Sequence, residues 1–284
     1  MRAGARVHGA VSIVNAIATG RGAAMGVDLW TEAEVSLRED GEIRVVIEGE
    51  PGEDTGLARR VVEKVLEKAG LKGWGAEVRT RSNIPIGRGL KSSSAASNAV
   101  ALATVKAAGL GMPSEEVVRL AVEASIEAGV SITGAFDDAY TCFFGGINLT
   151  DNHSKRLLKR WRAPEDIRVL ILVPEEKVYT GSVDVGSLRS LSRGFEKAVR
   201  YVEEGRFWEA MTLNGFLVAS ALSQDLSPIL CSLRAGAEAA GVSGTGPSVS
   251  AVVGEDAVER VREALEGFGR VLEVGVNNRE AEAW

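Results

Sequence analysis

The sequence predicts an α+β fold of two lobes, with mixed and antiparallel sheets and packed helices. Strand-like and helix-like segments follow one another in irregular order, whereas an all-parallel sheet would show a regular alternation of strands and helices. The chain has 284 residues, a length that predicts one large domain or two modest ones. The stretch 161–165 is the best boundary and divides the chain into lobes 1–160 and 161–284.

Most elements of the first lobe can be assigned from the spacing of apolar residues. Residues 35–48 alternate between apolar and polar around Asp40-Gly41, which predicts a β-hairpin. From Thr55 to Gly70 the apolar residues recur at helical spacing, which predicts a helix. The remaining patterns predict a strand over 76–80, a helix over 114–128, and a helix that passes into a Gly-rich strand over 139–150.

The second lobe shows the same kinds of pattern. Ser227-Pro228 places a good N-cap residue before a proline at the first helical position, which predicts a helix that ends near Gly241. The other predicted elements are strands over 167–173, 249–253 and 271–276, and helices over 195–202, 207–222 and 256–265.

Composition and charge argue against several classes of protein. The chain has 33 Lys and Arg against 39 Asp and Glu, a net charge of −6, and no basic run, so we expect no nucleic-acid partner. Two Cys and two His argue against a disulfide framework or a zinc site and fit a reducing cytoplasm. Because no segment approaches the ~20 apolar residues of a bilayer span, we expect no membrane anchor.

The most informative segment is 83–99, where glycines and serines precede a helix-like run. Gly87 and Gly89 allow the backbone to turn and to approach an anion closely. The amides of the next helical turn point at such a ligand, and the helix dipole adds positive potential. The hydroxyls of 92–94 suit phosphate or magnesium, and Lys91 supplies charge. We interpret the segment as a phosphate-binding loop; a capped helix after a flexible loop is the alternative.

This loop is not a Walker A sequence, because Leu90 separates Gly89 from Lys91. The second motif of the GHMP kinases, Pro, three residues, then Gly-Leu-x-Ser-Ser, matches at Pro85, Gly89, Leu90, Ser92 and Ser93. A Gly-rich turn at 243–248 matches the third motif, and the region 9–28 occupies the place of the first. With these motifs in this order, the chain resembles the GHMP kinase superfamily.

Within the superfamily the chain is most similar to the archaeal-type shikimate kinases. The similarity rests on the stretches 12–20, 89–95 and 133–139, and on Lys91, where most other relatives carry a small residue. This resemblance implies a two-lobed GHMP kinase fold and phosphorylation of the 3-hydroxyl of shikimate, a precursor of the aromatic amino acids. The implied cofactors are ATP and Mg²⁺.

The resemblance also implies roles for individual residues. The catalytic Asp of the family precedes a Gly at the end of an apolar run, which here is Asp138 before Gly145. The magnesium ligands of the family fall on Ser93 and Glu127. A solvated helix end for Glu127 and an N-cap for Asp138 are the structural alternatives. The phosphates of ATP would be held by Pro85, Gly87, Gly89, Leu90, Lys91, Ser92, Ser93, Ser94, Ala95, Gly244 and Gly246.

Shikimate carries a carboxylate and three hydroxyls, so its site needs a cation and polar side chains. Lys91 could serve this carboxylate or the phosphates of ATP. Because Asp137 and Asp138 are adjacent, we expect only one of them to face the site. The candidates for the substrate site are Asn15, Thr19, Arg21, Asp28, Thr133 and Asp137.

Two other functions compete with this interpretation. A homoserine kinase, or another small-molecule GHMP kinase, has a similar loop, although the amine of homoserine needs an acid in the pocket. A non-catalytic sensor of the same fold is expected to lack the acids that this chain carries at 137 and 138. The sequence leaves a homodimer open.

Overall fold

The structure is a computed structural model and describes residues 1–131, 134–177 and 183–284. Two sheets form within these residues, and this mixed content confirms the α+β class. The first sheet contains β1 (Arg2–Val14), β2 (Arg21–Arg38), β3 (Ile43–Ile47), β4 (Gly75–Ser82), β5 (Ile147–Asp151), β6 (Arg156–Trp161) and β11 (Glu282–Ala283). The second contains β7 (Ile167–Val173), β8 (Ala239–Val242), β9 (Val249–Gly254) and β10 (Arg270–Val274).

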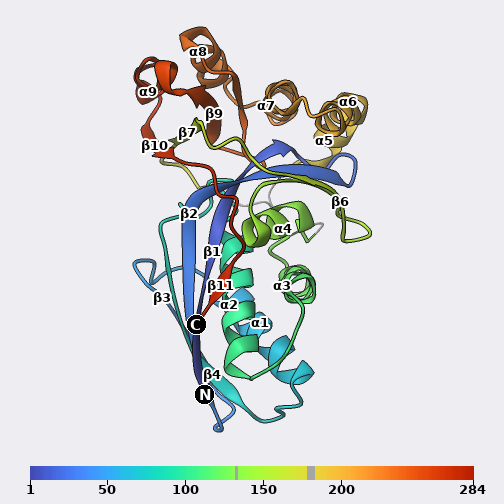
Figure 1. The fold of residues 1–284 in the computed structure, drawn as a ribbon, viewed down its shortest axis with the longest axis vertical. Helices are drawn as coiled ribbons and strands as arrows, with labels where there is room; N and C mark the ends of the chain where they lie inside the picture. Colours follow the sequence, from blue (N-terminus) through green and yellow to red (C-terminus); the bar gives the residue numbers. More distant parts are fainter. Residues whose placement is uncertain (132–133, 178–182) are drawn as a thin grey trace.

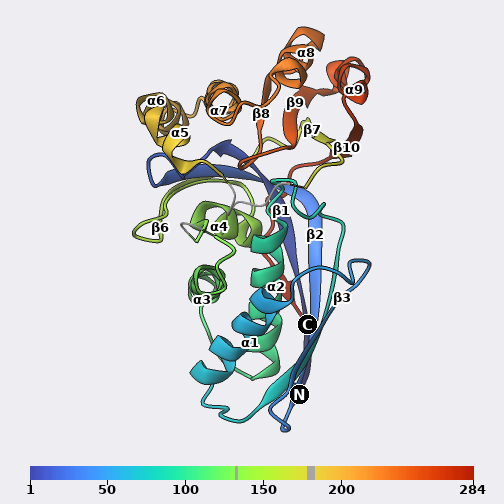
Figure 2. The same cartoon turned by 180° about the vertical axis from the view of Figure 1, so that it is seen from behind.

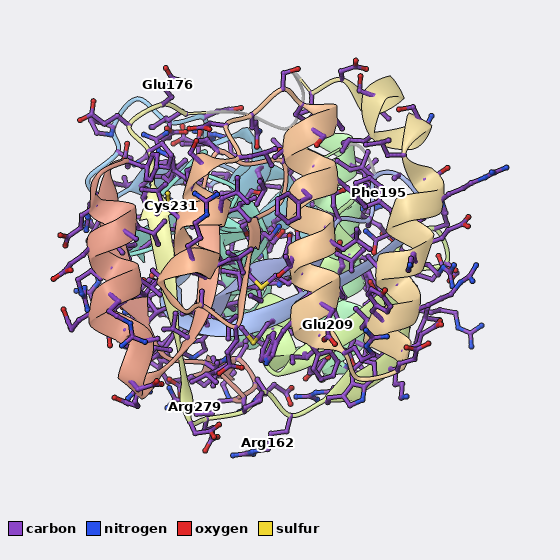
Figure 3. All side chains as sticks on the ribbon, turned by 90° about the horizontal axis from the view of Figure 1, so that it is seen from above. Arg162, Glu176, Phe195, Glu209, Cys231 and Arg279 are labelled. Atoms are coloured by element: carbon purple, nitrogen blue, oxygen red, sulfur yellow. The ribbon has the colours of Figure 1, made fainter. Side chains whose placement is uncertain are left out.

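Helices cover one face of each sheet (Figure 1 and Figure 2). In the first lobe, α1 (Gly56–Lys68), α2 (Ser92–Ala107) and α4 (Phe136–Phe144) pack on the sheet, and α3 (Ser114–Glu127) packs on these helices. Figure 3 shows helices of the second lobe side by side; Phe195 belongs to the helix that packs against the one that follows it in the chain. The helices of this lobe are α5 (Val185–Ser190), α6 (Ser192–Glu203), α7 (Phe207–Ala221), α8 (Ser227–Ala235) and α9 (Val258–Glu266).

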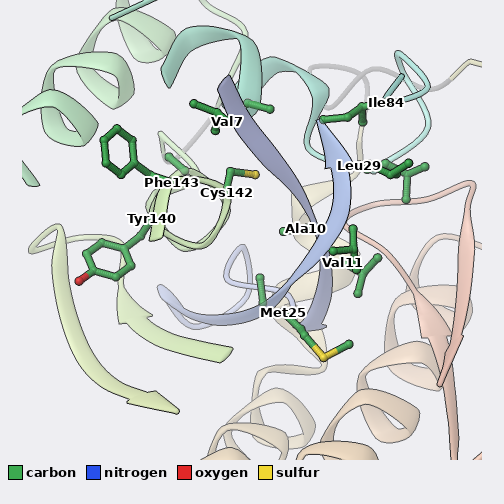
Figure 4. Packing of buried hydrophobic residues seen from close by; sticks show 14 of the residues in the cluster. Val7, Ala10, Val11, Met25, Leu29, Ile84, Tyr140, Cys142 and Phe143 are labelled. Carbon is green, nitrogen blue, oxygen red and sulfur yellow. The ribbon is translucent and has the colours of Figure 1, made fainter. Parts of the chain in front are cut away.

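The long antiparallel pair β1–β2 joins the two lobes. From Gly9 to Val14 every residue of β1 is buried. The cause is double coverage, because α4 packs on this pair and α7 packs on β1 from the second lobe. Figure 4 shows apolar side chains such as Val11, Met25 and Phe143 around the place where the two strands cross. A strand buried on both faces has no apolar–polar alternation, so periodicity did not reveal it.

The hairpin expected over 35–48 is wrong. β2 and β3 are not neighbours, because β4 lies between them and pairs antiparallel with β2 and parallel with β3. The chain passes from β3 through α1 to β4, and a crossover of this kind joins parallel strands. Gly41, with a φ of 74°, does turn the chain after β2. The turn signal was therefore correct and the pairing inferred from it was not.

The helix expected to run to Gly241 is also shorter than predicted. It ends at Gly236, whose φ of 109° is a conformation that glycine adopts readily, and β8 follows. The other predicted elements are confirmed to within a few residues, whereas β1, most of β2, β6, β8, β11 and α5 were not predicted. The division at 160 stays a prediction; the chain passes from the first sheet to the second between β6 and β7, and β11 returns to the first.

No helix in the described ranges is apolar over a length that would cross a bilayer.

Cys142 of α4 is fully buried, and burial raises the pKa of its thiol.

Close backbone packing between α7 and β8 gives a test of this arrangement. A Cβ at Gly215 of α7 would lie 2.5 Å from Cα of Gly241, with backbone on both sides of the contact. We expect Gly215→Ala to lower the free energy of unfolding by about 1–3 kcal/mol, measured by urea denaturation. Gly267→Ala is the control, because a Cβ there meets no atom within 4 Å. Equal stability of the two variants would contradict the packing.

Candidate active site

A cavity of about 460 Å³ lies where the two lobes meet. One wall is formed by the segment after β1, another by the loop before α2 and the first turns of that helix. The start of α4 and the turn at 244–245 close it. All three motif regions therefore border the same space.

Two Gly-rich turns meet at one wall of this cavity. Gly89 has a φ of 77°, and a Cβ there would lie 2.2 Å from the carbonyl oxygen of Ser243. The Ser243 hydroxyl donates to the carbonyl oxygen of Gly89 at 2.8 Å and accepts from the Ser12 amide at 3.2 Å. Only glycine fits at position 89, and its absence of a side chain lets the loop rest directly on the turn at 243–246.

The first turn of α2 forms an anion-binding surface. The amides of Ser92, Ser93 and Ser94 have no partner inside the helix, and all three residues line the cavity. The Ala95 amide donates to the carbonyl oxygen of Lys91 at 2.9 Å, so the free amides end at Ser94. Together with the helix dipole, these amides and hydroxyls suit a phosphate group.

Two carboxylates stand in the first turn of α4, and both line the cavity. Asp137 accepts a hydrogen bond from the Asn152 side-chain amide at 2.8 Å, and its own backbone amide donates to the Asn152 side-chain carbonyl at 3.0 Å. Burial and, next, the Asp138 carboxylate raise the pKa of Asp137 to about 7. The expectation that only one acid faces the site is wrong, because the end of a helix can present neighbouring residues to one cavity.

Lys91 connects these acids to β1. Its Nζ lies 3.1 Å from Oδ1 of Asp138 and donates to the Ser12 hydroxyl at 2.8 Å. That hydroxyl also accepts from the Gly244 amide at 2.9 Å. The side chains of Lys91 and Asp138 are 4% and 17% exposed, so the ion pair is well shielded from water. One ammonium group thus contacts both β1 and the first turn of α4.

The far end of the cavity is mostly apolar. Hydroxyl groups of Thr31, Thr80 and Ser82 lie among its apolar side chains. A cleft of this kind, apolar with a few polar groups, suits a planar ring such as a nucleotide base. The apolar residues were not assigned to a site, since their helical and strand spacing is that of core residues: Ile47, Leu57, Ala58, Ile86 and Val100.

Seven of the residues expected to hold the phosphates line the cavity: Gly87, Gly89, Lys91, Ser92, Ser93, Ser94 and Gly244. The other four do not. Leu90 and Ala95 are buried in the hydrophobic core. Gly246 faces Gln224, whose Nε2 lies 2.7 Å from where a Cβ would be. Pro85 lies outside the lining as well.

Among the substrate candidates, Asn15 and Asp137 line the cavity. Three others are engaged elsewhere. The Thr19 hydroxyl hydrogen-bonds with the backbone of Arg21 at 3.2 Å, and the Arg21 guanidinium lies 3.6 Å from a carboxylate of α6. Asp28 lies 3.7 Å from a buried histidine and is outside the cavity lining. Thr133 falls outside the described residues.

The two expected magnesium ligands do not come together. Ser93 lines the cavity and offers the kind of oxygen that Mg²⁺ prefers. Glu127 does not, because Lys64 binds its carboxylate at 2.7 Å and Arg60 at 2.5 Å, and these hydrogen bonds lower its pKa. No group of three or more acids, Cys or His that could hold a metal occurs within the described part of the chain.

Sequence reasoning missed several polar residues that support the site. The side-chain carbonyl of Asn214 in α7 accepts a hydrogen bond from the Asn15 backbone amide at 2.8 Å, and this bond connects the second lobe to the segment after β1. A Cβ at Gly22 would lie 2.2 Å from Oδ2 of Asp137, so this glycine makes room for the acid. Ser12 could have been identified from the sequence, because it is a polar residue that interrupts an apolar run.

Comparisons with known proteins find similarity along most of the chain. Residues 56–146 match the family described as GHMP kinases N terminal domain, and residues 200–271 match GHMP kinases C terminal. A shikimate kinase of Methanosarcina mazei is 46% identical over 281 residues, which cover 96% of this chain and 94% of that protein. One from Methanothrix thermoacetophila is 45% identical over 282 residues, which cover 99% and 96%.

Solved structures show the same fold at low sequence identity. Homoserine kinase from Cytophaga hutchinsonii superimposes with a TM-score of 0.73 at 20% identity, over 99% of this chain and 97% of that one. At this identity the likeness concerns the fold alone.

Titration of Asp137 should be visible in the stability of the protein. Its pKa is about 7 in the folded chain against an ordinary 3.8, so stability is highest with the acid protonated and falls between pH 4 and 7. The slope is at most about 1.4 kcal/mol per pH unit.

The variant Asp137→Asn removes this ionisation. We therefore expect the variant to gain stability relative to the unmodified chain across that range, measured by urea denaturation, and no further gain above pH 8. Parallel curves between pH 4 and 7 would show that Asp137 ionises normally.

Proposed function

The chain belongs to the GHMP kinase family, in the branch of the archaeal shikimate kinases, and from this premise we propose that it transfers the γ-phosphate of ATP to the 3-hydroxyl of shikimate. The observation that carries the proposal is that the first turn of α2 and the Asp138 carboxylate border one cavity. A phosphate site beside an acid is the arrangement that phosphoryl transfer to a hydroxyl requires.

The nucleotide occupies the cavity with its phosphates toward α2. The amides of Ser92–Ser94 hold the phosphates, and Gly89 lets the backbone approach them. The base lies in the apolar end, beside Leu57 and Val100. In this orientation the terminal phosphate points toward α4, where the acids are.

Asp138 acts on the acceptor. Its carboxylate orients the attacking hydroxyl or takes its proton as the bond to phosphorus forms. Asn15 and Asp137, which also line the cavity, supply hydrogen bonds to the other hydroxyls of the acceptor. Because the transition state of phosphoryl transfer involves little covalent help from the protein, this positioning is the main contribution of the chain.

Mg²⁺ belongs to the proposal as a partner of the nucleotide. When bound, it neutralises charge on the phosphates, and it usually takes only one or two protein oxygens. Ser93, which lines the cavity, would hold it through its hydroxyl. Glu127, with its two basic partners, would have to exchange them to join it.

The acceptor is tested by ADP release in the presence of ATP and Mg²⁺, with shikimate, homoserine and mevalonate compared at equal concentration. We expect turnover with shikimate alone, and phosphorus coupling at C3 in the NMR spectrum of the product. Turnover with homoserine instead would show that homoserine is the acceptor. The fold and the proposed phosphate site would be unaffected by that result. ATP binding without turnover of any acceptor would favour a sensor and contradict the proposal.

Asp138→Asn tests the role of the acid. The amide keeps the shape of the side chain but is a far weaker base, so we expect kcat to fall by about 10²–10⁴-fold. Asp256→Asn, at an exposed acid of the second lobe, is the control and should retain full activity. Urea denaturation of both variants checks folding. A kcat within a few-fold of the unmodified chain would rule out this role for Asp138.

A further inference from the structure

Lys91 has a backbone conformation that its residue type rarely adopts. Its φ of 66° and ψ of 26° place it in the left-handed region, immediately before α2. Residues with a side chain are uncommon there, and such strain is found where surrounding contacts fix the residue, often at functional sites. A glycine would meet the backbone requirement without strain. The reason for a lysine at this position must therefore lie in the contacts of its side chain.

That side chain is directed at two specific partners. An ammonium group has three N–H donors. One donates to the Ser12 hydroxyl at 2.8 Å, and the ammonium nitrogen lies 3.1 Å from Oδ1 of Asp138 as an ion pair. The Ser12 hydroxyl is itself fixed, because it accepts from the Gly244 amide at 2.9 Å. A second contact, besides that with Asp138, thus holds the ammonium in position.

Charge makes this contact important for Asp138. Among the described residues that line the cavity, Lys91 is the one that carries a positive side chain. Asp138 has Asp137 as its neighbour in sequence and in the cavity. Without the ammonium, the Asp138 carboxylate would lie beside a second acid in a poorly hydrated space, with no cation to hold its direction.

On the basis of the proposed function, we infer that Lys91 is a positioning residue: its ammonium aims the Asp138 carboxylate at the acceptor hydroxyl, and Ser12 holds the ammonium in place. The phosphates of ATP are then bound by the amides of α2 and the turn at 243–246. The sequence left two roles open for Lys91: binding the phosphates of ATP, or binding the carboxylate of the acceptor. Its contacts favour a third role, which is to position the acid that acts on the acceptor.

The test separates catalysis from ATP binding. Lys91→Gly removes the ammonium and suits the left-handed backbone, so it should fold. We expect kcat to fall about 10²-fold, while the Kd for ATP, measured by calorimetry without acceptor, stays within about threefold. Lys106→Met, at an exposed lysine of α2, is the control for loss of charge on the same helix. A weaker Kd for ATP with an unchanged kcat would overturn the inference.

A double variant shows whether Lys91 acts through Asp138. If it does, Lys91→Gly adds no more than about a twofold loss when Asp138 is already Asn. Propylammonium in the buffer should restore part of the kcat of Lys91→Gly and leave that of the double variant unchanged. Losses that multiply, or rescue in both backgrounds, would refute the inference. If shikimate is not the acceptor, the unmodified chain reveals this first, and the same comparison applies to the acceptor that it does phosphorylate.

Discussion

The geometry of the cavity depends on one buried ion pair, between the Lys91 ammonium and the Asp138 carboxylate, 3.1 Å apart. Through Ser12 and the Gly244 amide this pair links the loop before α2, the strand β1 and the third motif. These parts are far apart in sequence, and no local preference of the chain brings them together. A carboxylate in a shielded space is costly to leave unpaired, so the contact fixes the Asp138 side chain relative to the loop, to β1 and to the third motif.

The two helices whose first turns line the cavity begin in the same unusual way. Lys91 precedes α2 with a φ of 66°, and Ala135 precedes α4 with a φ of 47°. Each residue with this conformation costs of the order of 1 kcal/mol, and tertiary contacts must offset that cost. In return the chain turns sharply into each helix. The first-turn amides of α2 and the first-turn acids of α4 therefore face one space.

Sequence patterns predicted those features that depend on residues close together in the chain. The loop before α2 could be predicted as a phosphate site because glycines, serines and a helix start suit anion binding, and Asp138 could be proposed as the catalytic acid from the family pattern. The pairing of β3 with β4 could not, because it depends on where α1 places the chain. The substrate candidates Thr19, Arg21 and Asp28 failed for a related reason: each has a suitable polar group, but a nearby partner already engages it. Polarity in a motif region does not show which way a side chain points.

In the proposed function, the acidity of the chain favours a phosphate site that is built from backbone amides. A protein with a net charge of −6 attracts no polyanion at long range, so the positive potential for a triphosphate has to be local. The cavity lining described here includes four carboxylates, at positions 53, 54, 137 and 138, and the single cation Lys91. Since that cation is paired with Asp138, it has little charge left for phosphate. Free amides and a helix dipole remain, and they have the advantage that no carboxylate can neutralise them by forming an ion pair. A loop of Gly and Ser before a helix is therefore the solution that this acidic cavity requires.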